Sequence, residues 1–320
     1  MTELKSIDRK ILFELDSNSR QSFRTISKKV GLSKDAVIYR INKLKEEGII
    51  KGYQTILDLG KLGFISFRLY LKFQNTTPKK EEEIIEFLKR QKNISWIVSI
   101  EGEYDLGLWF LCKKNKEMDL FWKELLKKYR DYIEKKWLTI PTNVIYYSRN
   151  YLLEDNNQKI EEFNFISDLE VKIDDVDLEL LKVISSNARL PVLDISKIIK
   201  LNPKTVMSRL KRLEKEKIII GYRSVFDIDM LGYQYFKIHF NLHNLTSENE
   251  KKLKNYIKEN ENIIFNNEIL GGDDLEIEIQ VRSLQDLRKQ IDEIKKNFSG
   301  IIRNYKYMNF YKEHKCLSFP

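Results

Sequence analysis

Residues Gly31–Tyr53, GLSKDAVIYRINKLKEEGIIKGY, have the pattern of a DNA-recognition helix followed by the start of a wing. The same pattern returns 169 residues later as Lys200–Tyr222, KLNPKTVMSRLKRLEKEKIIIGY. The two segments align without a gap, and the positions that they share include Leu32/Leu201, Val37/Val206, Arg40/Arg209, Leu44/Leu213, Glu47/Glu216, Gly52/Gly221 and Tyr53/Tyr222. An internal repeat at a fixed offset predicts that the chain contains two copies of one structural module.

The residues around the first stretch complete a three-helix unit. Ser6–Asp16 carries apolar residues at helical spacing, and Ser22 is suited to cap a short second helix. Ser33 is the expected N-cap of the third helix, which ends before Gly48. Such a unit can lay its last helix in the major groove of DNA. Ile49–Asp58 then reads as a wing strand with a bend at Gly52.

The apolar face of the third helix is formed by Val37, Ile41 and Leu44, so the opposite face is free for DNA. The residues that we expect to contact DNA are Ser33, Lys34, Asp35, Tyr39, Arg40, Asn42 and Lys43, and in the second copy Asn202, Lys204, Thr205, Ser208, Arg209, Lys211 and Arg212. Two roles are open for Arg40 and Arg209, which are either phosphate ligands or ion-pair partners of Asp8 and Asp177. The alternative for the whole unit is a structural or protein-binding helical module.

The residues after each wing predict a second domain type. In the first copy we expect a strand in FISFRLYLKFQ (64–74), a helix over Pro78–Gln91, two strands within Ile94–Cys112, a helix over Lys116–Lys135 and a strand over Trp137–Tyr151. The order βαββαβ is that of the ferredoxin-like fold, and it repeats between Tyr233 and Lys312.

The expected fold class is α+β, with the following domains. They are a winged helix-turn-helix at 1–60, a ferredoxin-like domain at 61–152, an acidic linker at 153–172, a second winged helix-turn-helix at 173–229 and a second ferredoxin-like domain at 230–320. In the second copy Lys200 and Lys217 replace Gly31 and Gly48. A lysine can adopt positive φ at a cost of about 1 kcal/mol, so either that conformation or a slightly altered turn is open to the second unit.

The composition fits a globular DNA-binding protein. A net charge of +9 and a pI near 9.1 favour an anionic partner such as nucleic acid, although a Lys-rich solvated surface gives the same balance. Cys112 and Cys316 have no metal-ligand spacing and suggest a reducing compartment. There is no signal segment and no apolar run long enough to cross a membrane, so we expect a cytoplasmic protein. We expect neither a metal nor a cofactor.

Three fragments occur in the same order in both copies. They are IDRKIL (7–12), the recognition stretch and GEYDL (102–106), repeated as VDLELL (176–181), the second recognition stretch and GGDDL (271–275). This arrangement resembles the Lrp/AsnC (feast/famine) family of transcription regulators over essentially the whole chain. The resemblance implies promoter-DNA binding and ferredoxin-like (RAM/AsnC-type) domains that oligomerise and sense amino acids or related molecules. It also implies pairing of the two ferredoxin-like domains, which makes the chain a single-chain pseudo-dimer.

In this family the effector pocket uses the loop between the second and third strands of the ferredoxin-like domain. The resemblance places that loop at Gly102, Glu103, Tyr104 and Asp105, and at Gly271, Gly272, Asp273 and Asp274. It implies that a carboxylate such as Asp105 pairs with a ligand ammonium group. A plain turn is the alternative, because glycine and aspartate favour turns. Leu106 and Leu275 depart from the aromatic residue that is frequent in the family.

Two other functions fit the same architecture. Siroheme decarboxylases resemble Lrp/AsnC proteins and occur as fused two-copy chains, but they need a pocket with histidine and arginine. The three histidines, His239, His243 and His314, all lie in the second half of the chain, and the first strand pair contains none. A sequence-tolerant architectural DNA-binding protein differs from a regulator only in its specificity ratio. The sequence therefore favours a non-enzymatic regulator.

Overall fold

The computed structural model describes residues 4–153, 162–164 and 170–319. The elements of the first copy are α1 (Ser6–Ser17), α2 (Phe23–Val30), α3 (Lys34–Glu46), β1 (Ile50–Leu57), β2 (Ile65–Phe73), α4 (Pro78–Lys89), β3 (Ile94–Glu101), β4 (Leu106–Cys112), α5 (Asn115–Tyr129), η1 (Arg130–Tyr132), β5 (Ile133–Tyr147) and η2 (Asn150–Leu152). After the short strand β6 (Glu162–Asn164), the second copy has α6 (Asp175–Ser185), α7 (Val192–Ile198), α8 (Pro203–Lys215), β7 (Ile219–Phe226), β8 (Gln234–Leu242), α9 (Ser247–Glu259), β9 (Ile263–Leu270), β10 (Leu275–Val281), α10 (Leu284–Asn297) and β11 (Ile302–Cys316).

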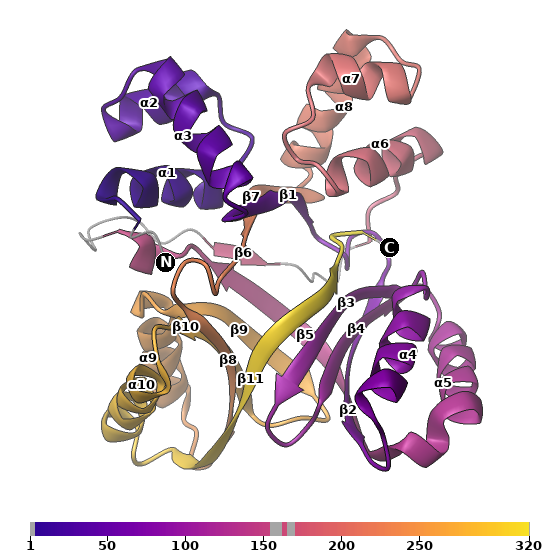
Figure 1. The fold of residues 1–320 in the computed structure, drawn as a ribbon. Helices are drawn as coiled ribbons and strands as arrows, with labels where there is room; N and C mark the ends of the chain where they lie inside the picture. The colour runs from indigo at the N-terminus through magenta and orange to yellow at the C-terminus, as the bar shows by residue number, and fades with distance from the viewer. Residues whose placement is uncertain (1–3, 154–161, 165–169, 320) are drawn as a thin grey trace.

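Each copy begins with three helices, which we call the first head (α1–α3) and the second head (α6–α8). Figure 1 shows the two heads side by side on one end of the molecule, above a large sheet. The caps that the sequence predicts are present, since the Ser22 side chain accepts a hydrogen bond from the Thr25 amide at 3.1 Å. Gly31 has φ 71°, and Lys200, its counterpart, has φ 54°. Of the two conformations open to the second unit, Lys200 adopts positive φ, so the second head keeps the left-handed turn.

The two ferredoxin-like domains share one closed sheet, which we call the barrel. The strand order is β5-β2-β4-β3 in the first domain and β11-β8-β10-β9 in the second. Antiparallel pairing of β3 with β11 and of β5 with β9 joins them at both edges, so eight strands close into a ring. Closure leaves no free edge in the ring, which removes a common site of aggregation. Helices α4, α5, α9 and α10 cover the outside (Figure 1).

The wing strands connect the two heads to each other. β1 pairs antiparallel with β7, from Ile50 opposite Phe226 to Leu57 opposite Ile219. The register shifts between Ile50 and Gly52, so the bend expected at Gly52 is present as a bulge in the ladder. α1 packs against β7 and α6 packs against β1, so each head rests on the wing of the other copy.

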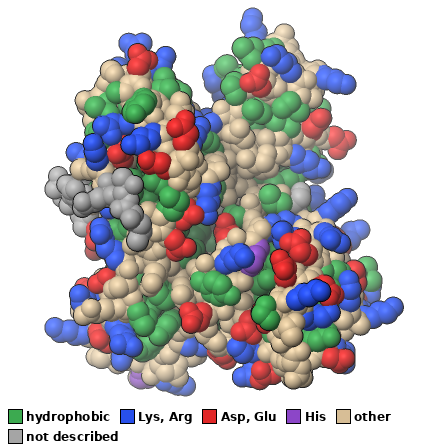
Figure 2. Space-filling view, in the orientation of Figure 1, with side chains coloured by type: hydrophobic (Ala, Val, Ile, Leu, Met, Phe, Trp, Pro, Cys, Tyr) green, Lys and Arg blue, Asp and Glu red, His purple; other side chains and the backbone are tan. Residues whose placement is uncertain are grey.

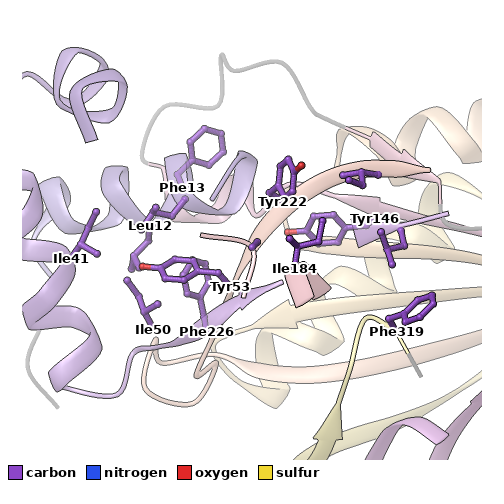
Figure 3. Close-up of a cluster of buried hydrophobic side chains, with 14 of the residues drawn as sticks. Leu12, Phe13, Ile41, Ile50, Tyr53, Tyr146, Ile184, Tyr222, Phe226 and Phe319 are labelled. Carbon is purple, nitrogen blue, oxygen red and sulfur yellow. The ribbon is translucent and has the colours of Figure 1, made fainter. Parts of the chain in front are cut away.

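A single apolar core therefore runs through both heads. It includes Leu12, Ile41 and Tyr53 from the first copy with Ile184 and Tyr222 from the second, as Figure 3 shows. Each fully buried Leu or Ile side chain contributes about 1.5–3 kcal/mol. Separate cores lie between each half of the barrel and its own pair of helices. The heads are consequently one packed unit rather than two independent domains.

Three predicted boundaries are wrong. α5 ends at Tyr129 and not at Lys135, because Ile133 and Lys135 pair with β2 and this pairing overrides the helix preference of the Lys/Glu run. The following strand, β5, accordingly starts at Ile133 and ends at Tyr147. β11 continues to Cys316, beyond Lys312, because its last residues pair with β3 of the first copy. The 153–172 linker lies partly outside the described residues, and its residues 162–164 form β6 beside β5.

Candidate DNA-binding surface and barrel interior

The recognition helices α3 and α8 are built as the sequence predicts. The Ser33 side chain accepts from the Ala36 amide at 3.2 Å, and Asn202 Oδ1 accepts from the Lys204 amide at 2.9 Å. Val37, Ile41 and Leu44 are buried, as are their counterparts Val206, Leu210 and Leu213. The opposite faces of α3 and α8 point to solvent, which is the arrangement that groove insertion needs.

Most of the residues predicted to contact DNA are exposed. Those with exposed side chains are Ser33, Lys34, Asp35, Tyr39, Asn42, Lys43, Asn202, Lys204, Thr205, Ser208, Lys211 and Arg212. Tyr39 is 69% exposed although it is large and aromatic. Figure 2 shows Lys and Arg side chains at the outer tips of both heads, interspersed with acidic groups. These tips are the chemically suitable surface for a phosphate backbone.

Arg40 and Arg209 are half-buried and form ion pairs within their own heads. Arg40 Nη1 lies 2.8 Å from Asp8, and Arg209 Nη1 lies 2.8 Å from Asp177. Arg212 also donates to Asp177, which is fully buried. Of the two roles open for these arginines, the structural ion pair is the one present. Each pair ties the recognition helix to the first helix of its head.

Reciprocal hydrogen bonds lock the two heads to each other across a pseudo-two-fold axis. Arg20 donates to the carbonyls of Ala188 and Leu190, and its counterpart Arg189 donates to those of Ser19 and Gln21. Thr55 donates to the Ile184 carbonyl at 2.7 Å, and Ser224 donates to the Leu15 carbonyl at 3.1 Å. Such self-complementary contacts are typical of two-fold dimer interfaces. Here they occur within one chain, so they fix the separation of the recognition helices.

Removing both cross-linking arginines, Arg20→Ala with Arg189→Ala, is expected to relax this separation. Each loss leaves two carbonyl groups without their donor, which costs about 1–3 kcal/mol. DNA binding will then discriminate less between the preferred half-site spacing and spacings altered by one or two base pairs. Electrophoretic mobility shifts on a series of spacings measure this. Arg288→Ala with Arg303→Ala removes the same charge from exposed positions elsewhere and should leave the discrimination intact; equal discrimination in both variants would contradict the role of the cross-links.

The two loops predicted to bind an effector approach one another at the end of the barrel away from the wings. Lys306 Nζ lies 3.4 Å from the Glu103 carboxylate and 3.2 Å from that of Asp273. Tyr104 is buried and stacks on Trp137, with ring centroids 5.9 Å apart. Gly271 has φ 77° and its carbonyl accepts from the Trp137 indole at 2.9 Å. The sequence did not reveal that both loops would share one ion-pair cluster.

The aspartates that close these loops have structural partners. Asp105 accepts from the Lys72 ammonium and the Phe73 amide, both at 2.7 Å. Asp274 accepts from the Leu242 amide at 2.6 Å. Both aspartates therefore secure the end of the neighbouring strand. At Gly272 an added Cβ would lie 2.0 Å from Ile269 Cδ1, so a larger residue there would require the Ile269 side chain to move.

The barrel interior holds a cluster of buried charges that the sequence did not reveal. Lys237, fully buried, lies 2.6 Å from Glu276 and 3.3 Å from Glu278. His239 Nδ1 lies 3.2 Å from both Glu276 and Asp273. Burial by itself would raise the pKa of Glu276, but the adjacent Lys237 and His239 lower it to about 2. The alternation of polar residues in β8 and β10 was the available signal, and it is normally typical of a solvent-facing strand.

The two copies have diverged inside the barrel. When the copies are aligned at the offset of 169, three aromatic residues of the first copy correspond to charged or ionisable residues of the second. These pairs are Tyr70/His239, Trp109/Glu278 and Trp137/Lys306. Lys306 lies over the Trp137 ring at 4.3 Å. Identical subunits could not provide such unlike partners at equivalent positions. The fusion therefore allows an asymmetric interior.

Among the described residues, no group of three or more His, Cys, Asp or Glu side chains is arranged to hold a metal ion. His314 Nε2 lies 2.8 Å from the Ser99 hydroxyl. His314 is eight residues along β11 from Lys306, which pairs with Asp273. No helix in the described part of the chain is both long and apolar enough to cross a membrane.

Comparisons with known proteins agree with the two heads. A family model described as winged helix-turn-helix DNA-binding matches residues 4–51 and again 173–220. An HTH-type transcriptional regulator of Pyrococcus furiosus is 33% identical over 125 residues, which are 39% of this chain and 82% of the relative. The HTH-type transcriptional regulator Ptr1 of Methanocaldococcus jannaschii is 38% identical over 105 residues, 32% of this chain and 68% of the relative.

Among solved structures, the siroheme decarboxylase NirDL superposes with a TM-score of 0.64 over 98% of this chain and 94% of its own. The two sequences are 12% identical, so this similarity concerns the fold alone. The two heads, the internal repeat and the curated relatives together establish the family of this chain. The chain belongs to the family of HTH-type, DNA-binding transcriptional regulators, and it carries the winged helix-turn-helix unit twice.

Proposed function

We propose that the two heads of each chain of this regulator together bind a specific DNA site made of two unlike half-sites. The observation that carries the proposal is that reciprocal bonds fix two recognition helices whose exposed residues differ. Tyr39 of α3 corresponds to Ser208 of α8, and Lys34 corresponds to Pro203. A rigid pair of different reading heads favours an asymmetric site, with half-sites one or more helical turns of about 34–36 Å apart.

Selection of genomic DNA fragments by the purified protein tests this proposal. The expected product is a two-part motif with unlike halves at fixed spacing. The Tyr39→Ser variant should change the preferred bases in one half only, and Ser208→Tyr should change the other. Recovery of two identical half-sites, or of no motif, would contradict specific asymmetric recognition. The second outcome would favour an architectural DNA-binding protein.

An amino-acid effector at the loops Gly102–Asp105 and Gly271–Asp274, and assembly into homo-oligomers, also belong to this proposal. Asp105 is committed to Lys72 and to the Phe73 amide, and the buried Asp273 to Lys306 and Asn241, so an effector ammonium group would meet the exposed Glu103 first. Light scattering with and without single amino acids tests both points together. A mass that stays at one chain, whatever amino acid is added, would remove assembly and its control from the proposal.

We propose that the chain is not a siroheme decarboxylase, despite the shared fold. The cavity at the wing end of the barrel has a volume of about 220 Å³, and its described lining residues include no histidine. Sites for drug-sized ligands occupy roughly 300–1,000 Å³, and a tetrapyrrole is larger than most such ligands. A UV–visible titration with siroheme tests this point. A shifted absorption band with loss of carboxylate groups from the tetrapyrrole would establish the enzyme instead.

A further inference from the structure

A cavity of about 220 Å³ lies between the paired wings and the barrel. One side is formed by β1 and β7, including Ile56, Arg223 and Phe226, and the other side by strands of both ferredoxin-like domains. Trp96, near the start of β3, lines this cavity, whereas the end of β3 leads into the predicted effector loop at Gly102. The cavity therefore lies at the opposite end of the barrel from the predicted effector loops. A cavity of about 150 Å³ already holds benzene, so there is room for a small organic molecule.

Three buried N–H groups from residues lining this cavity have no hydrogen-bond partner among the described residues. They are Arg68 Nε, Trp109 Nε1 and Gln280 Nε2. Arg68 is 5% exposed and Gln280 is fully buried. A buried donor without an acceptor costs about 1–3 kcal/mol, so an acceptor that enters the cavity and reaches these groups would be stabilised.

The orientation of the Gln280 amide follows from its other contacts. Its Oε1 accepts from Arg149 Nε at 3.0 Å and also from the Tyr151 hydroxyl. With the oxygen held by two donors, the nitrogen is the free end of the amide. Arg68 is placed between two indole rings, with its guanidinium 5.2 Å from Trp96 and 4.5 Å from Trp109.

The charge balance of the cavity favours an anion. No carboxylate of the described residues lies within ion-pair distance of Arg68. Four carboxylates line the cavity, those of Asp227, Asp229, Glu278 and Glu313, against the five cations Lys51, Arg68, Arg149, Arg223 and Lys312. Glu278 lies beside Lys237 and accepts from the Tyr235 hydroxyl, Asp227 pairs with Lys51, and Glu313 accepts from the Trp96 indole. Val98, Phe226 and Phe310 supply apolar wall. The lining thus combines one uncompensated cation and N–H donors with apolar and aromatic surface.

We propose that this cavity binds a small organic carboxylate with an aromatic or branched apolar body. The carboxylate would accept from the three free N–H groups, and the body would lie against the apolar wall. A carboxylate has two oxygens with four lone-pair sites, enough for all three donors. This site is distinct from the predicted effector loops.

The same cavity is connected to the first head. Gln280 Oε1 accepts from Arg149, and Arg149 forms an ion pair with Asp16 near the end of α1. Arg223 of β7 lies 3.7 Å from the centre of the Tyr146 ring, whose hydroxyl donates to Asp16. A ligand that moves Gln280 or β7 therefore acts on the contacts that hold the head. This regulatory part of the proposal rests on the proposed DNA-binding function.

Titration with benzoate, phenylacetate and indole-3-acetate tests the site, because Trp96 and Trp109 report on it by fluorescence. We expect at least one acid to change the fluorescence and to raise the melting temperature, and the matching uncharged amide to do neither. Gln280→Glu keeps an acceptor for Arg149 and Tyr151 but replaces the free donor with a negative oxygen. It should weaken the acid by roughly 10–100-fold.

Trp109→Phe removes one N–H donor and should weaken the same acid, whereas Trp122→Phe, on helix α5 outside the barrel, should not. Absence of binding for all three acids at millimolar concentration, by both fluorescence and melting, would overturn the proposal. Equal affinity in Gln280→Glu would overturn it as well, because the acid would then bind elsewhere.

The coupling between acid binding and DNA binding is measured separately, as a change in DNA affinity. A bound acid should change the affinity for a selected DNA site in the native protein and not in Gln280→Glu. By linkage, DNA should change the affinity for the acid by the same factor. If the chain binds no DNA, the proposed function fails while the fluorescence titration still decides the site. If both bind without mutual effect, the regulatory part fails.

Discussion

Replacing Lys34, Lys43, Lys204 and Lys211 together with alanine will lower DNA affinity by roughly 10²–10³-fold near 0.1 M salt. All four side chains are exposed on the recognition helices, at the outer tips of the heads. Each lysine that neutralises a phosphate releases about one counterion, so the slope of log affinity against log salt should fall by about 3–4. Fluorescence anisotropy on the selected site, at several salt concentrations, measures both quantities.

The matched control removes the same charge from the outer helices of the barrel. Lys79, Lys127, Lys251 and Lys296 are exposed on α4, α5, α9 and α10. Their replacement with alanine should leave the salt slope within one unit of the native value, because they lie far from the heads. Alanine is a good helix former, so both variants should keep native circular dichroism. Equal losses in the two variants would show that net charge, and not the recognition helices, governs binding.

Lys237→Met will produce the largest expected loss of stability, about 3–5 kcal/mol. The substitution keeps a similar volume but leaves Glu276 and Glu278 buried without their cation, since Lys237 is the ammonium group nearest to both. Urea denaturation followed by circular dichroism measures the loss. Adding Glu276→Gln and Glu278→Gln removes the uncompensated charges and should recover part of it. A triple variant no more stable than the single one would contradict this explanation.

The loss should also depend on pH in a defined direction. In the native protein the pKa of Glu276 is lowered from 4.5 to about 2, so its contribution is complete above pH 4.5 and is lost as the pH falls toward 2. In Lys237→Met, burial raises the pKa of the carboxyl groups, and the penalty appears above pH 4.5. The stability difference between the two proteins should therefore shrink between pH 7 and pH 3. A constant difference would place its origin in packing rather than charge.

The asymmetry of the chain connects these results. The copies keep residues that build each fold and that join the heads, such as Val37/Val206 and Thr55/Ser224, and they differ inside the barrel, as at Tyr70/His239. Asp16 and Arg149 have Ser185 and Ser318 as counterparts, so the ion pair beside the cavity exists on one side only. A cavity with an asymmetric lining and two different heads are a consequence of fusing the copies, because each copy can then change without altering the other.

The sequence by itself determined the modules, because their signals are local. Helical spacing, N-cap residues such as Ser33 and Asn202, and the offset of 169 were sufficient for the heads and for the order βαββαβ. Arg40 and Arg209 were correctly identified as candidates for ion pairs, but their spacing alone did not choose between a carboxylate and a phosphate. The aligned glycines of the first copy also identified the lysine positions at which positive φ is one of two open conformations.

Tertiary structure decided how the modules join. The pairings β1–β7, β3–β11 and β5–β9 connect residues far apart in the chain, and no local pattern encodes them. Closure of the barrel turns Lys237, Glu276 and Gln280 inward, although their alternation is typical of a solvent-facing strand. The cavity exists only because the wings pair above that closed barrel. The physical reason is that main-chain hydrogen bonds between distant strands determine which face of each strand is buried, and neither the cavity nor the buried charges can form without them.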